Sequence, residues 1–218
     1  MAIKFWSVGC SFADGVGLNN QNNRYGQLVA DQLGLQAQFL TRAGSSVDWA
    51  HNQIVMNDIQ KHDIVVWGIT SLERFSFFYH DHDHTLSLFV NSAVIGTKTF
   101  GDYQSALEIL FTSNHWTIQH VQLIQQIQLI ARRVGFDLIL LFHPELSTKA
   151  HGELLHYRLT NTGDLLIPRT GENVSWNGTW PPENSFLDRG NDGSHPGPKT
   201  HRAWADQILS FIKERNRA

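Results

Sequence analysis

Short apolar runs alternate with amphipathic segments along most of this chain. The apolar runs are continuous, which is typical of strands buried on both faces of a parallel sheet. The amphipathic segments repeat their apolar residues every three or four positions, as helices that cover such a sheet do. This pattern predicts strands over 3–8, 36–40, 63–68 and 136–142, and helices over 24–33, 47–59, 102–134 and 196–214, the third helix being broken near 113–114.

Local signals set the ends of several predicted helices. Gly34 follows the first helix and can end it, and either Ser45 or Ser46 can cap the second. A proline near the start of the last helix is well placed, because the N–H that it lacks would have no partner there. The order of elements predicts an α/β fold, a three-layer α/β/α sandwich with a parallel sheet of about five strands.

The length of 218 residues is that of one domain, and we expect a single domain over 1–218. Two stretches, near 75–101 and 144–191, do not continue the alternation of strands and helices. Both are rich in Asn, Asp, His, Gly and Thr. We expect them to be insertions or lids above the sheet.

Charge and composition exclude several classes of function. The chain has 17 Lys and Arg against 20 Asp and Glu, so no basic excess is available to neutralise phosphates, and we expect no nucleic-acid partner. No apolar run approaches the roughly 20 residues of a membrane span, and the apolar stretch at the N-terminus is short for a signal peptide. We therefore expect a cytoplasmic protein without a membrane partner. The lone cysteine, Cys10, allows no internal disulfide, and we expect it to pack against the sheet rather than to react.

Candidate chemistry follows the predicted strands. In doubly wound sheets the site lies outside the carboxyl ends of the strands. Residues 9–12 follow the first strand, 42–46 the second and 67–71 the third, and 192–196 precede the last helix. Together these loops supply hydroxyl groups, glycine-linked N–H donors, and an Asp and a His three residues apart.

The motifs in these loops are Gly-Cys-Ser-Phe at 9–12, Gly44, the segment 68–71, and Asp192-x-x-His195-Pro at 192–196. Their order and spacing resemble the SGNH/GDSL hydrolase family, in a variant with Cys in place of the usual Asp before the serine. The resemblance spans most of the chain. It implies a flavodoxin-like SGNH hydrolase fold and ester hydrolysis through an acyl-enzyme, with no cofactor and no metal.

By the same resemblance, Ser11 would be the nucleophile and His195 the general base, with Asp192 holding the imidazole in the required tautomer. Asp188 and His201 are the nearest alternatives for the acid and the base. The backbone N–H groups of Ser11 and Gly44 would be the first two donors to the oxyanion.

The third donor is where the sequence departs from the family. The family has an Asn side chain two residues after the glycine of the third loop, and this chain has Thr70 there, followed by Ser71. A hydroxyl can donate one hydrogen bond, but its reach is shorter than that of an amide. Asn91 or Asn114, each in or beside an insertion, is an alternative donor.

Three side chains are candidates for substrate binding. Trp176 and Trp180 lie in a stretch rich in Gly, Asn and Pro, and exposed aromatic rings there can stack on sugar faces or simply pack the loop. Arg74 can bind a substrate anion or pair with Glu73. We expect a short-chain acyl ester as substrate, such as O-acetyl groups on carbohydrate. The alternatives are a non-catalytic SGNH-like glycan-binding module and an acyltransferase that uses the same triad.

A run of alternating histidines lies in the first insertion. In an extended strand His80, His82 and His84 would share one face, an arrangement found in zinc sites. The same residues can instead line the substrate cleft or belong to a solvated lid. Because no second ligand cluster accompanies them, we predict no metal site.

Overall fold

A computed structural model describes residues 2–70, 72, 74–75, 88–89, 115–142, 165–166 and 186–217. Its strands are β1 (Lys4–Gly9), β2 (Gln36–Thr41), β3 (Ile64–Ile69), β4 (Arg74–Phe75), β5 (Leu88–Phe89), β6 (Asp137–Phe142) and β7 (Leu165–Leu166). Its helices are α1 (Ser11–Asp14), the 3₁₀ helix η1 (Gln21–Asn23), α2 (Tyr25–Leu33), α3 (Val47–Met56), α5 (His115–Val134) and α7 (Pro198–Arg215). The predicted α/β fold with a parallel sheet is confirmed.

The main sheet is parallel and has the order β2-β1-β3-β6-β7. In its register Val8 of β1 lies between Leu40 of β2 and Trp67 of β3. From β1 the chain first adds a strand on one side and then continues on the other, so the strand order reverses between β1 and β3. Such a switch point is where doubly wound folds bind ligands, at the carboxyl ends of the strands.

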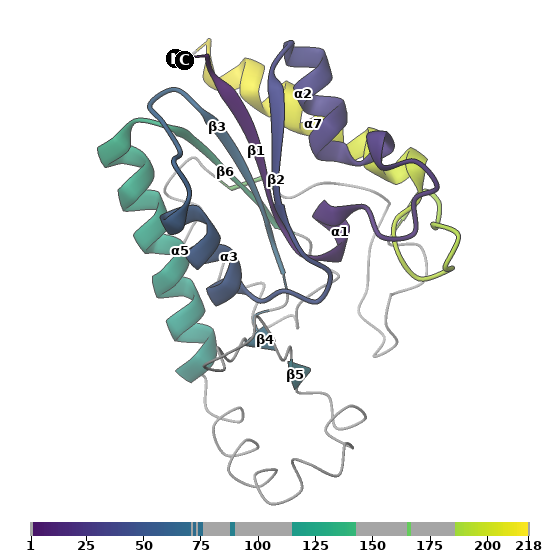
Figure 1. The fold of residues 1–218 in the computed structure, drawn as a ribbon, viewed down its shortest axis with the longest axis horizontal. Coiled ribbons are helices and arrows are strands. Elements are labelled where there is room, and N and C mark those ends of the chain that lie inside the picture. Colours follow the sequence, from purple (N-terminus) through teal and green to yellow (C-terminus); the bar gives the residue numbers. More distant parts are fainter. Residues whose placement is uncertain are drawn as a thin grey trace, which may run out of the picture.

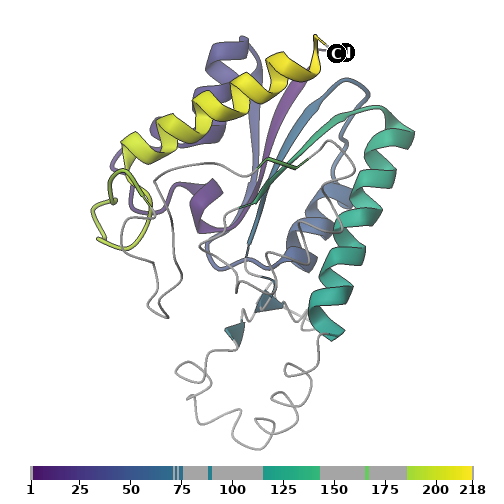
Figure 2. The same ribbon diagram turned by 180° about the vertical axis from the view of Figure 1, so that it is seen from behind.

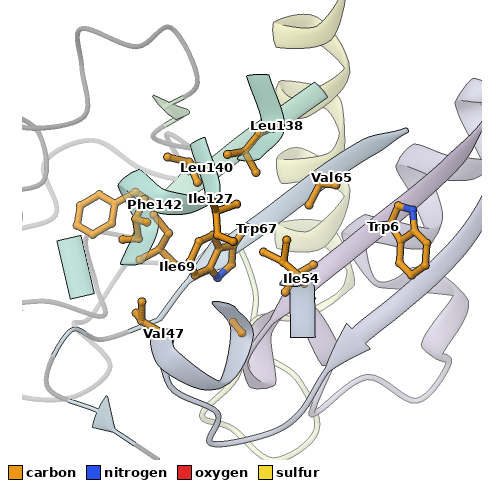
Figure 3. Packing of buried hydrophobic residues seen from close by; sticks show 14 of the residues in the cluster. Trp6, Val47, Ile54, Val65, Trp67, Ile69, Ile127, Leu138, Leu140 and Phe142 are labelled. Atoms are coloured by element: carbon orange, nitrogen blue, oxygen red, sulfur yellow. The ribbon is translucent and has the colours of Figure 1, made fainter. Parts of the chain in front are cut away.

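Helices cover both faces of the sheet, with α3 and α5 on one side and α2 and α7 on the other (Figure 1). On the first side, alternate strand residues pack against the helices, among them Val65, Trp67 and Ile69 of β3. Figure 3 shows how these side chains meet Ile54 of α3 and Ile127 of α5. The continuous apolar runs thus reflect burial on both sides of each strand.

The second side has its own core. The remaining strand residues, including Phe5, Val66 and Ile139, pack against α2 and α7. The whole length of α7 along this face is visible from behind (Figure 2). Trp204 of α7 is fully buried and its ring stacks on Phe12 of α1, with centroids 5.9 Å apart. This stacking joins the last helix to the helix that begins at Ser11.

Several predicted boundaries shift by a few residues. The helix expected over 47–59 ends at Met56, since Asn57 is its C-cap and bonds the Gln53 carbonyl through its side chain at 2.8 Å. Of the two serines considered as caps, Ser46 accepts the N–H of Trp49 at 3.4 Å. The first helical residue of α7 is Pro198, two positions later than expected.

Five elements were not predicted, namely α1, the 3₁₀ helix η1 and the short strands β4, β5 and β7. The four-residue helix α1 is too short to have a detectable period. Strand β7 lies inside the stretch 144–191, which we expected to be an insertion, and it pairs with Leu140 and Leu141 of β6. In the described part of the chain, no helix is both long enough and apolar enough to cross a membrane.

Candidate active site

Ser11 is the first residue of α1, immediately beyond the carboxyl end of β1. Ser11 is buried, with 7% of the residue exposed. The helix is a single turn, in which the N–H of Asp14 bonds the Cys10 carbonyl at 2.9 Å and the N–H of Val16 bonds the Ser11 carbonyl at 3.0 Å. Ser11 is therefore held in a closed turn beside the switch point of the sheet.

Asp192 and His195 lie in a loop before α7, which we call the dyad loop (residues 188–197). Backbone bonds close it, from the N–H of Gly190 to the His195 carbonyl at 2.8 Å and from the N–H of Gly193 to the Gly190 carbonyl at 2.9 Å. Within it, the Nδ1 atom of His195 is 2.5 Å from Oδ2 of Asp192. An ionised carboxylate only accepts hydrogen bonds, so Nδ1 carries the hydrogen and Nε2 of a neutral imidazole is left as the base.

The other carboxylate oxygen of Asp192 is also engaged. Oδ1 accepts the backbone N–H groups of Ser194 and His195, both at 3.0 Å. Partial burial acts to raise the pKa of Asp192, but the bonds from the His195 and Ser194 N–H groups and from the imidazole outweigh it and lower the pKa to about 2. Asp192 is therefore an anion at neutral pH and is fixed in orientation before any substrate arrives.

The dyad loop rests on the segment that follows α1 (Figure 1). The N–H of Asn191 bonds the carbonyl of Gly17 at 2.9 Å. Gly17 has a φ of +87°, and a Cβ atom there would lie 3.0 Å from Oδ1 of Asp192 and 3.3 Å from Cβ of His195. Phe12 adds a ring contact to His195, with centroids 6.0 Å apart. The structure thus brings Asp192 and His195 against the segment that contains Ser11.

The loop that contains Gly44 is fastened to the same strand end. The Gly9 carbonyl accepts both the N–H of Arg42 and the hydroxyl of Ser45, each at 3.1 Å. The N–H of Ser45 closes a turn on the Arg42 carbonyl at 3.0 Å, and Gly44 within it has a φ of +76°. Gly44 is therefore held close to the residue pair that precedes Ser11.

The third loop begins at Thr70, which directly follows β3 and is 2% exposed. Gly68 of β3 pairs in register with Gly9 of β1, so Thr70 and Ser11 follow neighbouring strands at the same edge of the sheet. Ser71 lies outside the described residues. The described part of the site thus gathers Ser11, Gly44 and Thr70 at the ends of three adjacent strands.

The two alternatives for the dyad have other contacts. Asp188 accepts the N–H groups of Lys199 at 3.0 Å and Thr200 at 2.8 Å, which fits a cap for the start of α7. His201 is fully buried and its Nδ1 accepts the N–H of Tyr25 at 3.2 Å. The pKa of His201 is lowered to about 4, mainly by burial; the charge of Asp188 opposes the shift and that of His195 adds to it.

Other candidates cannot be placed. Trp176, Trp180, the histidines at 80, 82 and 84, Asn91 and Asn114 lie outside the described residues. The backbone of Arg74 belongs to β4, but its side chain is not described. Among the described residues there is no group of three or more His, Cys, Asp or Glu that could hold a metal ion. Cys10 is 3% exposed and belongs to the core on the α7 side.

Sequence reasoning missed two parts of the site. Ser45 was considered only as a helix cap, and its bond to Gly9 spans 36 residues, a distance that no local pattern reveals. Gly17 was not singled out, although a second glycine soon after Gly15 is a signal for a left-handed backbone position.

Comparison with known proteins adds support at the level of the fold. No family model matches the chain, and no curated protein matches it. Among solved structures, the esterase EstA of Pseudoalteromonas sp. has a TM-score of 0.53 at 11% identity, over 99% of each chain. A G-D-S-L family protein from Desulfitobacterium hafniense has a TM-score of 0.52 at 11% identity, over 95% of this chain and 98% of the other.

Carbohydrate esterases are also among the similar structures. A family two carbohydrate esterase of Clostridium thermocellum, solved with cellohexaose, has a TM-score of 0.55 at 11% identity over 98% of this chain. The chain spans only between 63% and 65% of the length of the carbohydrate esterases that it matches. The order of the strands and these similarities agree: the chain has the fold of the SGNH hydrolases.

Proposed function

We propose that this chain is a serine ester hydrolase in which Ser11 is the nucleophile, His195 the general base and Asp192 the residue that orients the imidazole. The observation that carries the proposal is the 2.5 Å hydrogen bond between Asp192 and His195. That bond lies in a loop whose backbone is tied to Gly17, six residues beyond Ser11. The likeness to esterases of the same fold supports the reaction class.

In the first step Oγ of Ser11 bonds to the acyl carbon while its proton passes to Nε2 of His195. The electron pair of the carbonyl moves to its oxygen. When the tetrahedral intermediate collapses, the bond to the leaving alcohol breaks and the alcohol takes the proton from His195. Water then repeats both steps on the acyl-enzyme and regenerates Ser11, so the reaction needs neither a metal nor a cofactor.

The oxyanion formed in each step requires hydrogen-bond donors already in place. The backbone N–H groups of Ser11 and Gly44 are two of them, and the hydroxyl of Thr70 or Ser71 is the third. One such donor contributes about 3 kcal/mol to lowering the barrier. A short hydroxyl in place of an amide is expected to reduce the rate rather than to abolish it.

The substrate we propose is a short acyl ester, with O-acetyl groups on carbohydrate as the first class to test. The similar esterase solved with cellohexaose supports a glycan ligand. Trp176 and Trp180 supply aromatic rings suited to stacking on sugars, and Arg74 is a candidate contact for a polar substituent. The polar composition of the two stretches around them also favours a hydrated substrate over a long acyl chain.

The test is hydrolysis of p-nitrophenyl acetate by wild type, Ser11→Ala and His195→Ala, with Ser210→Ala as a matched control on the exposed side of α7. We expect both site variants to lose about a thousandfold or more, and the control to be unchanged. A fluorophosphonate should label wild type on Ser11, as located by mass spectrometry. Full turnover by Ser11→Ala would remove Ser11 from the mechanism.

Two further measurements on the wild type, glycan binding and transfer to a sugar, test the two alternative functions. A wild type that neither turns over nor takes the label, but binds cello- or xylo-oligosaccharides in calorimetry, would be a glycan-binding module. A wild type that transfers acetyl to an added sugar faster than to water would be an acyltransferase with the same triad.

A further inference from the structure

A buried histidine and a partly exposed aspartate lie together near the carboxyl edge of the sheet, and the proposed reaction does not use them. His120 of α5 is 1% exposed, and the residues four and seven positions later, Ile124 and Ile127, are fully buried in the core on the α3 side. An apolar side chain would suit that face of the helix. A histidine there needs polar partners, and its Nδ1 has one within hydrogen-bond distance.

The first partner of His120 lies in the loop that follows β3 and begins at Thr70. Nδ1 of His120 is 2.9 Å from the carbonyl oxygen of Leu72. A carbonyl only accepts, so Nδ1 carries the hydrogen and donates it. Leu72 is fully buried and lies two residues beyond Thr70. The bond therefore holds the chain immediately after the proposed third oxyanion donor.

The second contact of His120 is with Asp48 in α3, the helix that follows the Gly44 loop. Nε2 of His120 is 3.9 Å from Oδ1 of Asp48, in the first turn of α3. This is an ion-pair distance, longer than a hydrogen bond, so the contact is attractive when the imidazole is protonated. Asp48 is four residues beyond Gly44, and α3 begins where the Gly44 loop ends. One side chain from α5 thus touches the segments that carry two of the proposed oxyanion donors.

We propose that His120 is a positioning residue that sets the spacing between the Gly44 loop and the Thr70 loop. It acts through the Leu72 carbonyl on one side and Asp48 on the other, and it touches no reacting atom. The inference rests on the proposed function, because the spacing matters for catalysis only if both loops face an oxyanion. A displacement of about 1 Å between groups of this kind can cost about a hundredfold in rate.

The substitutions that test this are His120→Leu and His120→Asn. Leucine places an apolar side chain among apolar neighbours and removes the bond to Leu72. Asparagine keeps an N–H donor at the position of Nδ1 and should rescue the bond. As a matched control, His51→Asn changes a histidine between the same two helices that bonds Gln126 at 3.2 Å.

For His120→Leu we expect kcat on p-nitrophenyl acetate to fall by about tenfold or more at unchanged KM. The melting temperature should also fall, because the buried Leu72 carbonyl loses its donor. His120→Asn and His51→Asn should keep kcat within about threefold. By hydrogen–deuterium exchange, amides around Leu72 and Asp48 should exchange faster in His120→Leu only. A purely structural role would lower the melting temperature alone and leave kcat of the folded enzyme unchanged, which would overturn the proposal.

Activity, labelling and hydrogen–deuterium exchange together distinguish a failure of the positioning role from a failure of the proposed function. An active wild type whose His120→Leu variant keeps full kcat would refute the positioning role alone. An inactive, unlabelled wild type would refute the esterase, and with it any role of His120 in catalysis. Unchanged exchange at both loops in His120→Leu would refute the contact itself, whatever the activity.

Discussion

The Nδ1 atom of His201 in α7 accepts a hydrogen bond from the backbone N–H of Tyr25, the first residue of α2, at 3.2 Å. The first N–H groups of a helix have no partner within it, so this histidine satisfies one of them across the helix pair. The imidazole must be unprotonated at Nδ1 to accept the bond. The ring of Tyr25 stacks on that of His201, with the two centroids 5.8 Å apart, and leaves little room for water.

Stability should therefore depend on pH through His201. Its pKa falls from 6.5 in the unfolded chain to about 4 in the folded one, because burial disfavours the cation. Between these two pKa values the unfolded state binds more protons than the folded state. The free energy of unfolding therefore has its full value above about pH 6.5 and declines as the pH falls towards 4. The full difference is about 3 kcal/mol. Urea unfolding at pH 7.5 and 5.0 should show about 2 kcal/mol of this difference, because pH 5.0 is still above the pKa of the folded state.

His201→Asn provides the comparison for that measurement. The amide oxygen can accept the Tyr25 N–H in place of Nδ1, but it does not titrate. The variant should lose much of the difference between the two pH values while the other histidines are unchanged. An identical pH dependence in wild type and variant would exclude His201 as its source.

Asp192 and Asp188 should have separable effects. Asp192→Asn is expected to lower kcat/KM by about a thousandfold to ten-thousandfold with little change in stability, because the amide favours the wrong tautomer of His195. Asp188→Asn weakens the cap of α7 and should cost about 1 kcal/mol of stability with kcat retained. Esterase kinetics and thermal unfolding of both variants test this, and the reverse pattern would make Asp188 the acid.

Gly17 offers a test of how tightly the dyad is held. In Gly17→Ala the new Cβ would lie 3.0 Å from the Asp192 carboxylate, so the dyad loop must move. Gly34→Ala is the matched control, since its φ of +66° is equally unfavourable, its Cβ would have nothing within 4 Å, and it lies at the end of α2 outside the dyad loop. Both should lose about 1–2 kcal/mol of stability. Only Gly17→Ala should also lose kcat, by about tenfold or more, and equal kcat in the two variants would contradict this.

Asp63 stabilises the opposite edge of the sheet. Its buried carboxylate accepts the N–H groups of Lys4 at 2.8 Å and Gln60 at 3.0 Å and the indole N–H of Trp6 at 2.8 Å. Asp63→Leu leaves these donors without the carboxylate and should lower the free energy of unfolding by about 3 kcal/mol. Asp63→Asn keeps one acceptor and should lose less. Neither should change kcat of the folded enzyme, and chemical denaturation with p-nitrophenyl acetate kinetics checks both points.

The sheet could be predicted because its strands are buried on both faces. The predicted ends of β1, β2, β3 and β6 lie within one residue of the observed ones, since each run is bounded by glycine or polar residues. By contrast, β7 has only two residues in a polar stretch, and its pairing with β6 is a tertiary contact. Local patterns contain no signal for such a strand.

The candidate site was predictable only in part for a similar reason. Asp192 and His195 are three residues apart, so their pairing is local and a motif can express it. The bond from His120 to Leu72 spans 48 residues, so the helical pattern can place this histidine on the apolar face of α5 but cannot identify its partner. Likewise, the contact of Gly17 with Asp192 depends on how the dyad loop returns to the start of the chain.

The order in which the elements leave the ribosome has a consequence for biogenesis. Strands β1, β2 and β3 are complete early, but one of their faces is covered by Trp204, Ala205 and Ile208 of the last helix. Until α7 emerges, Phe5 and Val66 on that face have no cover from it. Chains that lack α7 should therefore be bound by chaperones or aggregate, and the sheet should reach its native packing only after α7 has been synthesised.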